Sequence, residues 1–250
     1  MREWLKSSTM LESAASCGAT WLGATVAAMC LLGVPGMALA DSFTPPAGVT
    51  DYRLAFVTDD TTDATSTTIS DYNTFVTDDA ANNRSLPATT WTAIASTPST
   101  DGGVDAATNI SCGTLCDETV PIFLVDGTTE VAASTDDLLS PSSIMNVIDE
   151  DENGNATQYS YVWTGSNADG TAATGNELGS STPVFGNPFY DGGYNMIDLG
   201  PDFFDGSSDE FPLYAISGEI SSAVPEPATL SLLAFGGAVL GLLRRRRPAR

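Results

Sequence analysis

The chain has 250 residues and a formal net charge of −23, with 32 acidic residues, 9 basic residues and no histidine. Between residues 41 and 224 only Arg53 and Arg84 are basic against 29 acidic residues, so this stretch has a net charge of −27. A surface this acidic repels nucleic acids and anionic lipid headgroups, and we expect neither as a partner. The missing histidine excludes Ser-His and Cys-His catalysis and removes the usual zinc ligand.

Residues 1–40 have the features of a secretory signal peptide. Two basic residues lie near the start, and residues 21–34 form an apolar run of 14 residues, within the usual length for the core of such a peptide. Ala38 and Ala40 then form a small-x-small cleavage site. We therefore expect signal peptidase to cleave the chain so that Asp41 becomes the first mature residue.

The first elements predicted after the leader are a strand and a helix. Residues 52–58 form a short apolar strand, and a polar loop follows. Thr68 and Asp71 have the spacing of a capping box, which predicts a helix over residues 68–81 that ends at Asn82 and the asparagine after it. The apolar residues on one face of this helix are Ile69, Tyr72, Phe75 and Val76.

Further short strands are predicted along the chain. The segment 121–132 indicates a β-hairpin with Asp126-Gly127 at its turn. The long stretch over residues 165–210 is rich in Gly, Asn, Asp and Ser and is typical of surface loops. Together these elements predict a small α+β domain with an antiparallel sheet. The other predicted strands are residues 91–95, 159–164 and 213–220.

The order of these segments resembles a family of uncharacterised bacterial surface domains with an endostatin-like variant of the C-type-lectin fold. The parallels span residues 52–217 and are YRLAFVT, the helix after it, WTAIAS, PIFLVDGT, the DENG turn, VWTGSNADGT and LYAIS. The resemblance implies short antiparallel strands, one or two helices and long loops. The Glu-Pro-Asn and Trp-Asn-Asp motifs of the lectin fold are absent, so sugar binding is an analogy of fold only.

Two of the four cysteines, Cys112 and Cys116, lie outside the leader. An even pair in an oxidising compartment most simply forms a disulfide, here across a tight loop. A metal site made from this pair would lack further ligands, and the C-x-x-x-C spacing departs from the C-x-x-C of redox motifs.

The segment from Asp149 to Gly154 contains the pattern D-x-D-x-N-G, the first half of a calcium-binding loop. Asp149, Asp151 and Asn153 would supply side-chain oxygens, and Ser160 stands where the loop needs a bidentate Glu. The alternative is an acidic β-turn between strands. Calcium is the one cofactor that the sequence raises.

No residue stands out as catalytic. A glycosidase needs only two carboxylates, but nothing in the sequence selects a pair, and there is no Gly-x-Ser-x-Gly motif. We therefore expect that the protein is not an enzyme. The aromatic residues in the later segments suit either sugar stacking or a loop core. They are Trp163, Phe185, Phe189, Tyr190 and Tyr194.

The C-terminus has three parts in a fixed order. Val224 leads into Pro225, Glu226 and Pro227, and residues 228–243 then form an uncharged apolar stretch of 16 residues, followed by four arginines. As a helix this stretch would be about 24 Å long, slightly short of a bilayer core. The arginines should stay in the cytoplasm, which would hold the acidic domain outside as a transiently anchored intermediate.

These three parts resemble the PEP-CTERM sorting signal of Gram-negative-type bacteria over residues 224–247. Pro225, Glu226 and Pro227 match the family's motif one for one. The resemblance implies recognition by an exosortase, a membrane cysteine transpeptidase-like enzyme. It also implies an inner-membrane intermediate, a final place at the cell surface or in the extracellular matrix, and a setting of exopolysaccharide and biofilm production.

Three functions remain open. The leading hypothesis is an exported, non-enzymatic protein, structural or adhesive in the exopolysaccharide matrix. The first alternative is a carbohydrate-binding module that recognises exopolysaccharide, and the second is a hydrolase that uses paired carboxylates. The predicted domain organisation is a signal peptide at 1–40, a lectin-like domain at 41–223 and a sorting signal at 224–250.

Overall fold

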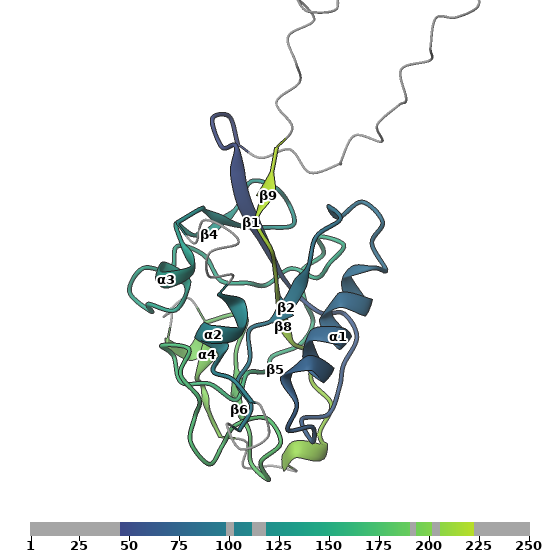
Figure 1. Ribbon diagram of the computed structural model, residues 1–250, viewed down its shortest axis with the longest axis vertical. Coiled ribbons are helices and arrows are strands. Elements are labelled where there is room, and N and C mark those ends of the chain that lie inside the picture. The colour runs from purple at the N-terminus through teal and green to yellow at the C-terminus, as the bar shows by residue number, and fades with distance from the viewer. Residues whose placement is uncertain (1–45, 99–102, 112–118, 191–193, 202–205, 223–250) are drawn as a thin grey trace, which may run out of the picture. The chain divides into compact units, whose positions relative to one another are not determined.

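The computed structural model describes residues 46–98, 103–111, 119–190, 194–201 and 206–222. Within them short strands alternate with short helices and long connections, which confirms the α+β class (Figure 1). The helices are α1 Ile69–Ala80, α2 Ala106–Ile110, α3 Thr135–Leu138 and α4 Tyr194–Ile197, with a 3₁₀ turn at Gly206–Ser208.

The larger sheet has six strands in the order β2-β8-β1-β3-β4, with β9 also paired to β1. The β1–β8, β1–β9, β2–β8 and β3–β4 pairs are antiparallel, as predicted, but β1 and β3 run parallel. The expectation of a wholly antiparallel sheet was therefore wrong at this pair. The chain between them is a long crossover through α1, β2 and α2, which is the kind of connection that a parallel pair needs. The strands are β1 Asp51–Val57, β2 Trp91–Ala93, β3 Ile122–Leu124, β4 Glu130–Ala132, β8 Tyr214–Ser217 and β9 Ile220–Ser221.

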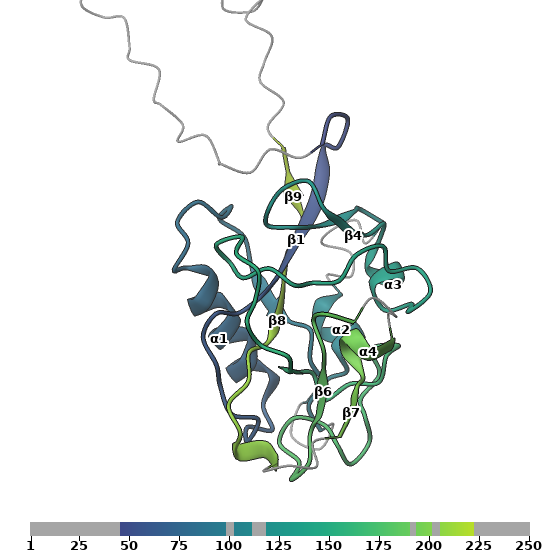
Figure 2. The same ribbon diagram turned by 180° about the vertical axis from the view of Figure 1, so that it is seen from behind.

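Strand β1 is the centre of the domain, and its side chains reach two separate cores. Leu54 and Phe56 point to the core that α1 covers, whereas Ala55 and Val57 point to the core shared with α2, α3 and α4. All four are 0 % exposed. Because successive strand residues face opposite sides, a strand covered on both faces appears in the sequence as a continuous apolar run. Figures 1 and 2 show α1 on one side of β1 and β8, and α2, α3 and α4 on the other.

Helix α1 confirms the predicted helix, but its start differs in detail. Thr68 is the N-cap residue with extended backbone, yet its side chain makes no capping hydrogen bond. The carboxylate of Asp71 instead accepts a 2.6 Å hydrogen bond from the Ser66 hydroxyl. The predicted capping box is therefore wrong, because the loop before the helix takes the carboxylate. At the other end, the backbone N–H groups of Asn82 and Asn83 bond the last turn, as predicted.

The hairpin of β3 and β4 is confirmed, with its turn at Asp126-Gly127. Gly127 has a φ of +79°, a conformation that favours glycine. The Asp126 carboxylate accepts hydrogen bonds from the backbone N–H groups of Thr128 at 2.8 Å and Thr129 at 2.9 Å. This local bonding stabilises the turn, while a register shift between Ile122 and Phe123 bends the pair.

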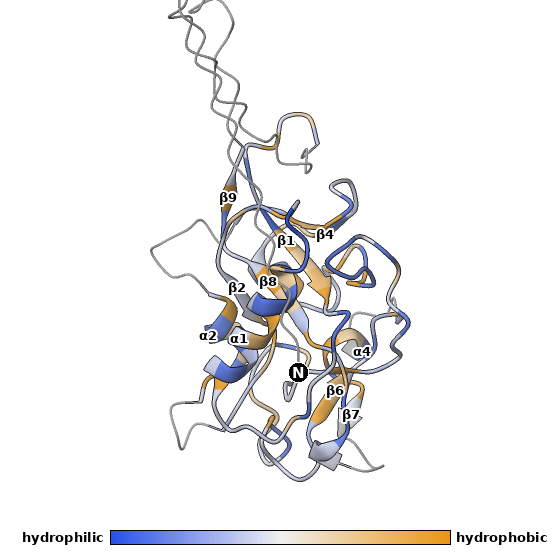
Figure 3. Ribbon diagram, turned by 90° about the vertical axis from the view of Figure 1, so that its right-hand side faces the viewer, coloured by the Kyte–Doolittle hydropathy of each residue, from blue (hydrophilic) through white to orange (hydrophobic). Residues whose placement is uncertain are grey.

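A second sheet joins the strand predicted at residues 159–164 to two strands in the stretch predicted as surface loops. It has three antiparallel strands, β5 Val162–Trp163, β6 Val184–Gly186 and β7 Gly200–Pro201. Gly186 has no room for a side chain, because a Cβ there would meet the backbone of Met196 in α4. Strand β5 confirms the strand predicted there, whereas β6 and β7 were missed, since two or three residues carry no readable alternation. Figure 3 shows hydrophobic residues gathered on the strands and hydrophilic ones along the connecting loops.

Candidate functional site

Several of the predicted sites, at the two ends of the chain and in its middle, lie outside the described residues. These are the leader with its cleavage site at Ala38, Ala40 and Asp41, the tail with Pro225, Glu226 and Pro227, and the pair Cys112 and Cys116. The apolar stretch 228–243 is also outside. Across the part of the chain that the structure describes, there is no helix with the length and apolarity to span a membrane.

The acidic segment that the sequence singled out lies at the carboxyl end of the central strands. The backbone N–H of Val57, the last residue of β1, donates to the Glu150 carbonyl at 2.7 Å. The N–H of Asp126, just after β3, donates to the Glu150 carboxylate at 3.2 Å. β1 and β3 run parallel, so their carboxyl ends meet at one edge of the sheet. We call this region the acidic edge; its residues are Asp59, Asp60, Asp79, Asp126, Asp149, Glu150, Asp151 and Glu152.

The proposed half of a calcium loop forms a hydrogen-bonded turn. Asp151 Oδ1 accepts from the backbone N–H groups of Asn153 at 2.8 Å and Asn155 at 2.9 Å, and Asp151 Oδ2 accepts from the Asn155 side chain at 3.0 Å. The Asn155 carbonyl accepts from the Asp151 N–H at 2.8 Å. The carbonyl of Asp149 accepts from the N–H of Thr157. Thus the oxygens of Asp151 and Asn155 bond the turn itself, which favours the acidic-turn interpretation.

No group of three or more Asp, Glu or Cys side chains among the described residues is placed to hold a metal ion. Ser160, at the position of the missing Glu, is exposed in the connection to β5. Calcium binding at Asp149, Asp151 and Asn153 therefore stays a prediction that only a titration tests.

The acidic edge contains a carboxyl pair that the sequence analysis missed. Asp79 comes from the last turn of α1. Glu152 comes from the hydrogen-bonded turn over residues 149–154, which we call the acidic turn. Each of the two side chains is 2 % exposed. Asp79 Oδ1 accepts from the N–H of Asp60 at 3.4 Å, and Glu152 Oε2 accepts from the N–H of Asp59 at 3.2 Å. The other oxygen of Asp79 has no partner if both groups are ionised. A proton on Asp79, donated to Glu152, resolves this.

The electrostatics of the edge favour protonated carboxyls. Burial, followed by the charge of Glu152, raises the pKa of Asp79 to about 8, so Asp79 carries its proton at neutral pH. Burial also raises the pKa of Glu152. Burial and the charge of Asp126 raise the pKa of Glu150 to about 7, and burial raises the pKa of Asp149. The edge is therefore less negative at neutral pH than its sequence implies.

The buried pair is better suited to holding the fold than to catalysis. An acid beside a carboxylate can in principle move a proton, but a substrate must reach it, and both side chains are enclosed. Instead the pair joins α1 to the acidic turn, together with the Asn83 side chain, which donates to the Glu152 carbonyl at 2.7 Å. The burial of Asp79 could have been predicted from the sequence. Tyr72, Val76 and Asp79 follow helical spacing, so Asp79 shares the buried face of α1.

The aromatic residues divide into core and surface groups. Trp163 is 0 % exposed and donates from its indole nitrogen to the Thr62 carbonyl, and Phe185 is 7 % exposed. Phe189 and Tyr190 are 50 % and 51 % exposed. Tyr194 begins α4, and its side chain is not described. The loop-core interpretation thus holds for the first two residues, whereas Phe189 and Tyr190 present rings to the solvent.

The comparisons with known proteins bear on the tail. Residues 223–247 match the family model described as the PEP-CTERM protein-sorting motif. This range contains Pro225, Glu226 and Pro227, the apolar stretch and the arginine cluster. No curated protein matches the chain. The chain thus carries a PEP-CTERM sorting motif, which makes it an exported protein that is processed by an exosortase and trafficked through the membrane to the cell surface.

Proposed function

We propose that the protein is a non-enzymatic component of the cell envelope or extracellular matrix, with a structural or adhesive role. The sorting motif at residues 223–247 carries this proposal, because it delivers the acidic domain to the outside of the cell. The structure of the domain supports it in two ways. The buried carboxyl groups of Asp79 and Glu152 form hydrogen bonds within the domain. Phe189 and Tyr190 offer exposed rings for contact with other matrix components.

We also propose that the domain is the endostatin-like variant of the C-type-lectin fold. The support is the order of its elements: β1, then α1, then β2, then the β3–β4 hairpin and the late strand β8. All of these except β4 overlap the segments that carry the resemblance. An experimentally determined structure that superimposes on no lectin-like domain would overturn the assignment.

Alanine substitution of Pro225, Glu226 and Pro227 tests the proposed role. Without the motif we expect the protein to stay in the inner-membrane fraction and to be absent from the cell surface and matrix, as measured by fractionation and immunoblotting. Glu210→Ala, which removes an exposed carboxylate upstream of the tail, is the matched control and should leave the location unchanged. Surface delivery of the triple variant would contradict the proposal, and so would an intact matrix in cells that lack the protein.

The hydrolase alternative gains one observation, the carboxyl pair of Asp79 and Glu152. Its separation from solvent disfavours turnover. Incubation of the exported protein with a polysaccharide panel should release no reducing ends. Release that Glu152→Gln abolishes would replace the structural role with an enzymatic one.

A further inference from the structure

The described part of the domain begins and ends at one place, the amino-terminal end of β1. Pro46 opens a turn that leads into β1, and β9 returns along the start of β1 to Ser222 (Figures 1 and 2). We call residues 46–51 and 219–222 together the ribbon tip. The acidic edge lies at the other end of β1, about 20 Å away, because a strand rises about 3.3 Å per residue from Asp51 to Val57.

The ribbon tip is held together by bonds between its two strands. β9 pairs with the start of β1 in antiparallel register. Beyond this pairing, the N–H of Ser222 donates to the Thr50 carbonyl at 2.6 Å, and Ser221 Oγ donates to Asp51 Oδ1 at 2.7 Å. The side chain of Ile220 packs against the core that α1 covers. The folded domain therefore holds the chain in place as far as Ser222.

The sorting motif begins three residues after this fixed point. Only Ala223 and Val224 separate Ser222 from Pro225. Three residues of chain span at most about 11 Å, whatever their conformation. An exosortase that binds the motif must therefore hold Pro225 within about 11 Å of the end of β9.

This reach is short compared with the size of a protein wall. One α-helix with its side chains is about 10–12 Å across, so an enzyme that encloses the motif brings its own surface against the ribbon tip. Separating β9 from β1 would lengthen the reach by four residues, about 14 Å. That separation would break the hydrogen bonds of the ribbon tip and remove Ile220 from its apolar contacts. The bonded ribbon thus favours contact with the enzyme over unpairing.

The chemistry of the ribbon tip suits contact with another protein. Of its ten residues only Asp51 and Glu219 are charged. The hydroxyl groups of Thr50 and Ser221 donate to the Asp51 carboxylate at 2.8 Å and 2.7 Å. The eight carboxyl residues of the acidic edge lie at the other end of β1. A partner at the ribbon tip therefore removes few charges from water, which lowers the cost of contact.

We propose that the ribbon tip is the surface that the exosortase contacts while it holds the Pro-Glu-Pro motif. Anionic lipid is the other neighbour at this position, but the net charge of −27 over residues 41–224 disfavours it. Processing requires the enzyme to bind the motif, whereas no step requires the tip to touch lipid. The proposal concerns the sorting step and does not depend on the role of the protein in the matrix.

Photo-crosslinking in whole cells tests the contact. Ala47 is exposed in the turn of the ribbon tip, and Ala156 is exposed just after the acidic turn. Benzoylphenylalanine replaces one or the other in the full-length protein, in cells whose exosortase is inactive, so that the unprocessed form accumulates. We expect position 47 to cross-link to the exosortase and position 156 not to do so. The cross-link should disappear when Pro225, Glu226 and Pro227 are changed to alanine.

The rate of tail removal gives a second readout. In a pulse-chase experiment that follows the form without its leader, Ala47→Trp should slow tail removal about fivefold or more, because a bulky ring disrupts a close contact. Ala156→Trp should change the rate by less than about twofold. A flexible Gly-Ser insertion of about 12 residues between Ser222 and Ala223 adds roughly 20 Å of reach. Behind this insertion, Ala47→Trp should no longer slow processing.

Three results would overturn the proposal. The first is the absence of a motif-dependent cross-link to the exosortase at position 47, including a cross-link to lipid alone. The second is normal processing of Ala47→Trp, and the third is slow processing of Ala47→Trp that persists behind the long insertion. The cross-linking arm does not depend on the stability of the tryptophan variant. A matrix role can fail while the contact is found, and the contact can fail while the protein still reaches the surface.

Discussion

Arg53 is a buried cation in the middle of β1, where a strand residue would ordinarily be apolar. It is 1 % exposed. Its guanidinium donates to the Ser217 carbonyl at 2.6 Å, the Thr135 hydroxyl at 2.9 Å and the Ile110 carbonyl at 3.0 Å. One side chain therefore joins β1 to β8, to the start of α3 and to the end of α2. A planar fork with several donors suits this geometry better than an ammonium group.

Replacing Arg53 should destabilise the domain strongly. Arg53→Met removes three donors and leaves buried acceptors unpaired, so we expect a loss of about 3–5 kcal/mol in the free energy of unfolding. Arg53→Lys should recover only part of it, because an ammonium cannot reach all three acceptors. Arg84→Met, at an exposed position, should change stability by less than about 0.5 kcal/mol. Urea unfolding measures all three, and equal stability of Arg53→Met and Arg84→Met would contradict the structural role.

Asp79 shows how a buried carboxyl couples folding to pH. Its pKa is raised to about 8, mainly by burial and then by the charge of Glu152, with Asp60 also facing it. In the unfolded chain it titrates near its ordinary value, so between about pH 4 and pH 8 the folded protein binds the extra proton. Stability from this proton is complete below the unfolded pKa and is lost as pH rises through the folded pKa.

We therefore expect the thermal midpoint of the wild type to fall as the pH rises from 6 to 9. Asp79→Asn mimics the protonated acid and can still donate to Glu152, so its midpoint should fall less over the same range. The thermal midpoint of Asp79→Asn should still fall somewhat at the lower end of this pH range, because the pKa of Glu150 is also raised. Asp78→Asn, on the exposed side of the same helix turn, should keep the wild-type slope. Parallel profiles for wild type and Asp79→Asn would mean that Asp79 is ionised in the folded protein.

Strand β2 lies at the edge of the larger sheet, and polar side chains from two helices cover it. The N–H of Ala93 donates to Asn73 Oδ1 of α1 at 2.8 Å, and the Ala93 carbonyl accepts from Asn109 Nδ2 of α2 at 2.7 Å. The two asparagines also bond each other. These side chains occupy backbone groups that would otherwise be open to another strand. The helices thus protect the edge as well as the cores.

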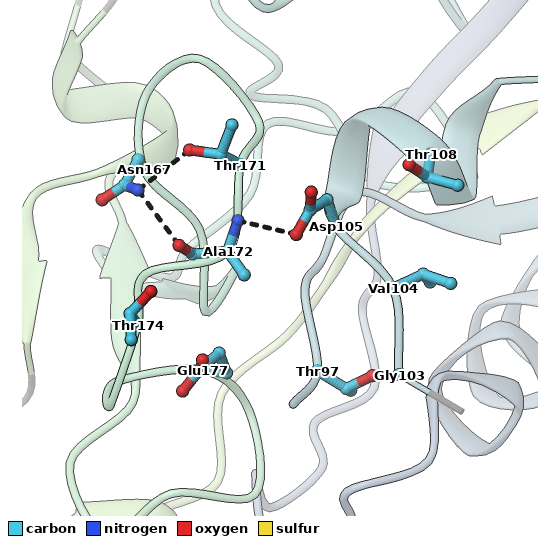
Figure 4. A pocket seen from close by; sticks show the side chains of 10 residues that line it. All are labelled: Thr97, Gly103, Val104, Asp105, Thr108, Asn167, Thr171, Ala172, Thr174 and Glu177. Atoms are coloured by element: carbon cyan, nitrogen blue, oxygen red, sulfur yellow. Dashed lines mark hydrogen bonds between the residues drawn. The ribbon is translucent and has the colours of Figure 1, made fainter. Parts of the chain in front are cut away.

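Some elements of this fold can be predicted from the sequence, and others cannot. Local patterns were sufficient for α1 and for the β3–β4 hairpin, because apolar spacing and an Asp-Gly turn specify them over a few residues. The parallel pairing of β1 with β3 depends on how the intervening chain packs, which no local pattern records. The polar pocket that Thr97, Asp105 and Glu177 help to line likewise needs segments distant in sequence brought together by the fold (Figure 4). The burial of Asp79 was readable from helical spacing and was overlooked.

The hydrogen bonds of the acidic turn predict how the loss of the Asp151 carboxylate affects stability. Asp151→Ala removes the acceptor for two backbone N–H groups, so we expect a loss of about 1–2 kcal/mol. The loss should be the same with calcium, with magnesium and without either, at constant ionic strength, because the turn is bonded without a cation. Thermal midpoints of wild type and variant in the three solutions provide the measurement. A calcium-selective rise in the wild type that Asp151→Ala abolishes would instead establish the cation site.

Charge is separated along the full length of the chain. Residues 41–224 carry a net charge of −27, whereas five of the last seven residues are arginines. The basic cluster opposes translocation of its own end, while the acidic domain has little to hold it in the cytoplasm. The apolar stretch between them should therefore stop in the membrane with the Pro-Glu-Pro motif at the outer surface. This is the position at which a membrane-embedded exosortase can reach it.

The ends of the mature chain test this arrangement directly. We expect the intact mass of the surface-delivered protein to correspond to residues 41–227, because signal peptidase acts after Ala40 and the exosortase removes residues 228–250. In cells without the exosortase the mass should correspond to residues 41–250, and the protein should be found in the membrane fraction. The described domain gives an internal control, since its Tm should be equal in the two products if processing acts only on the tail. A tail that persists in cells with active exosortase would show that residues 228–243 serve as a permanent anchor, and a mass that includes residues 21–34 would show that the leader is retained.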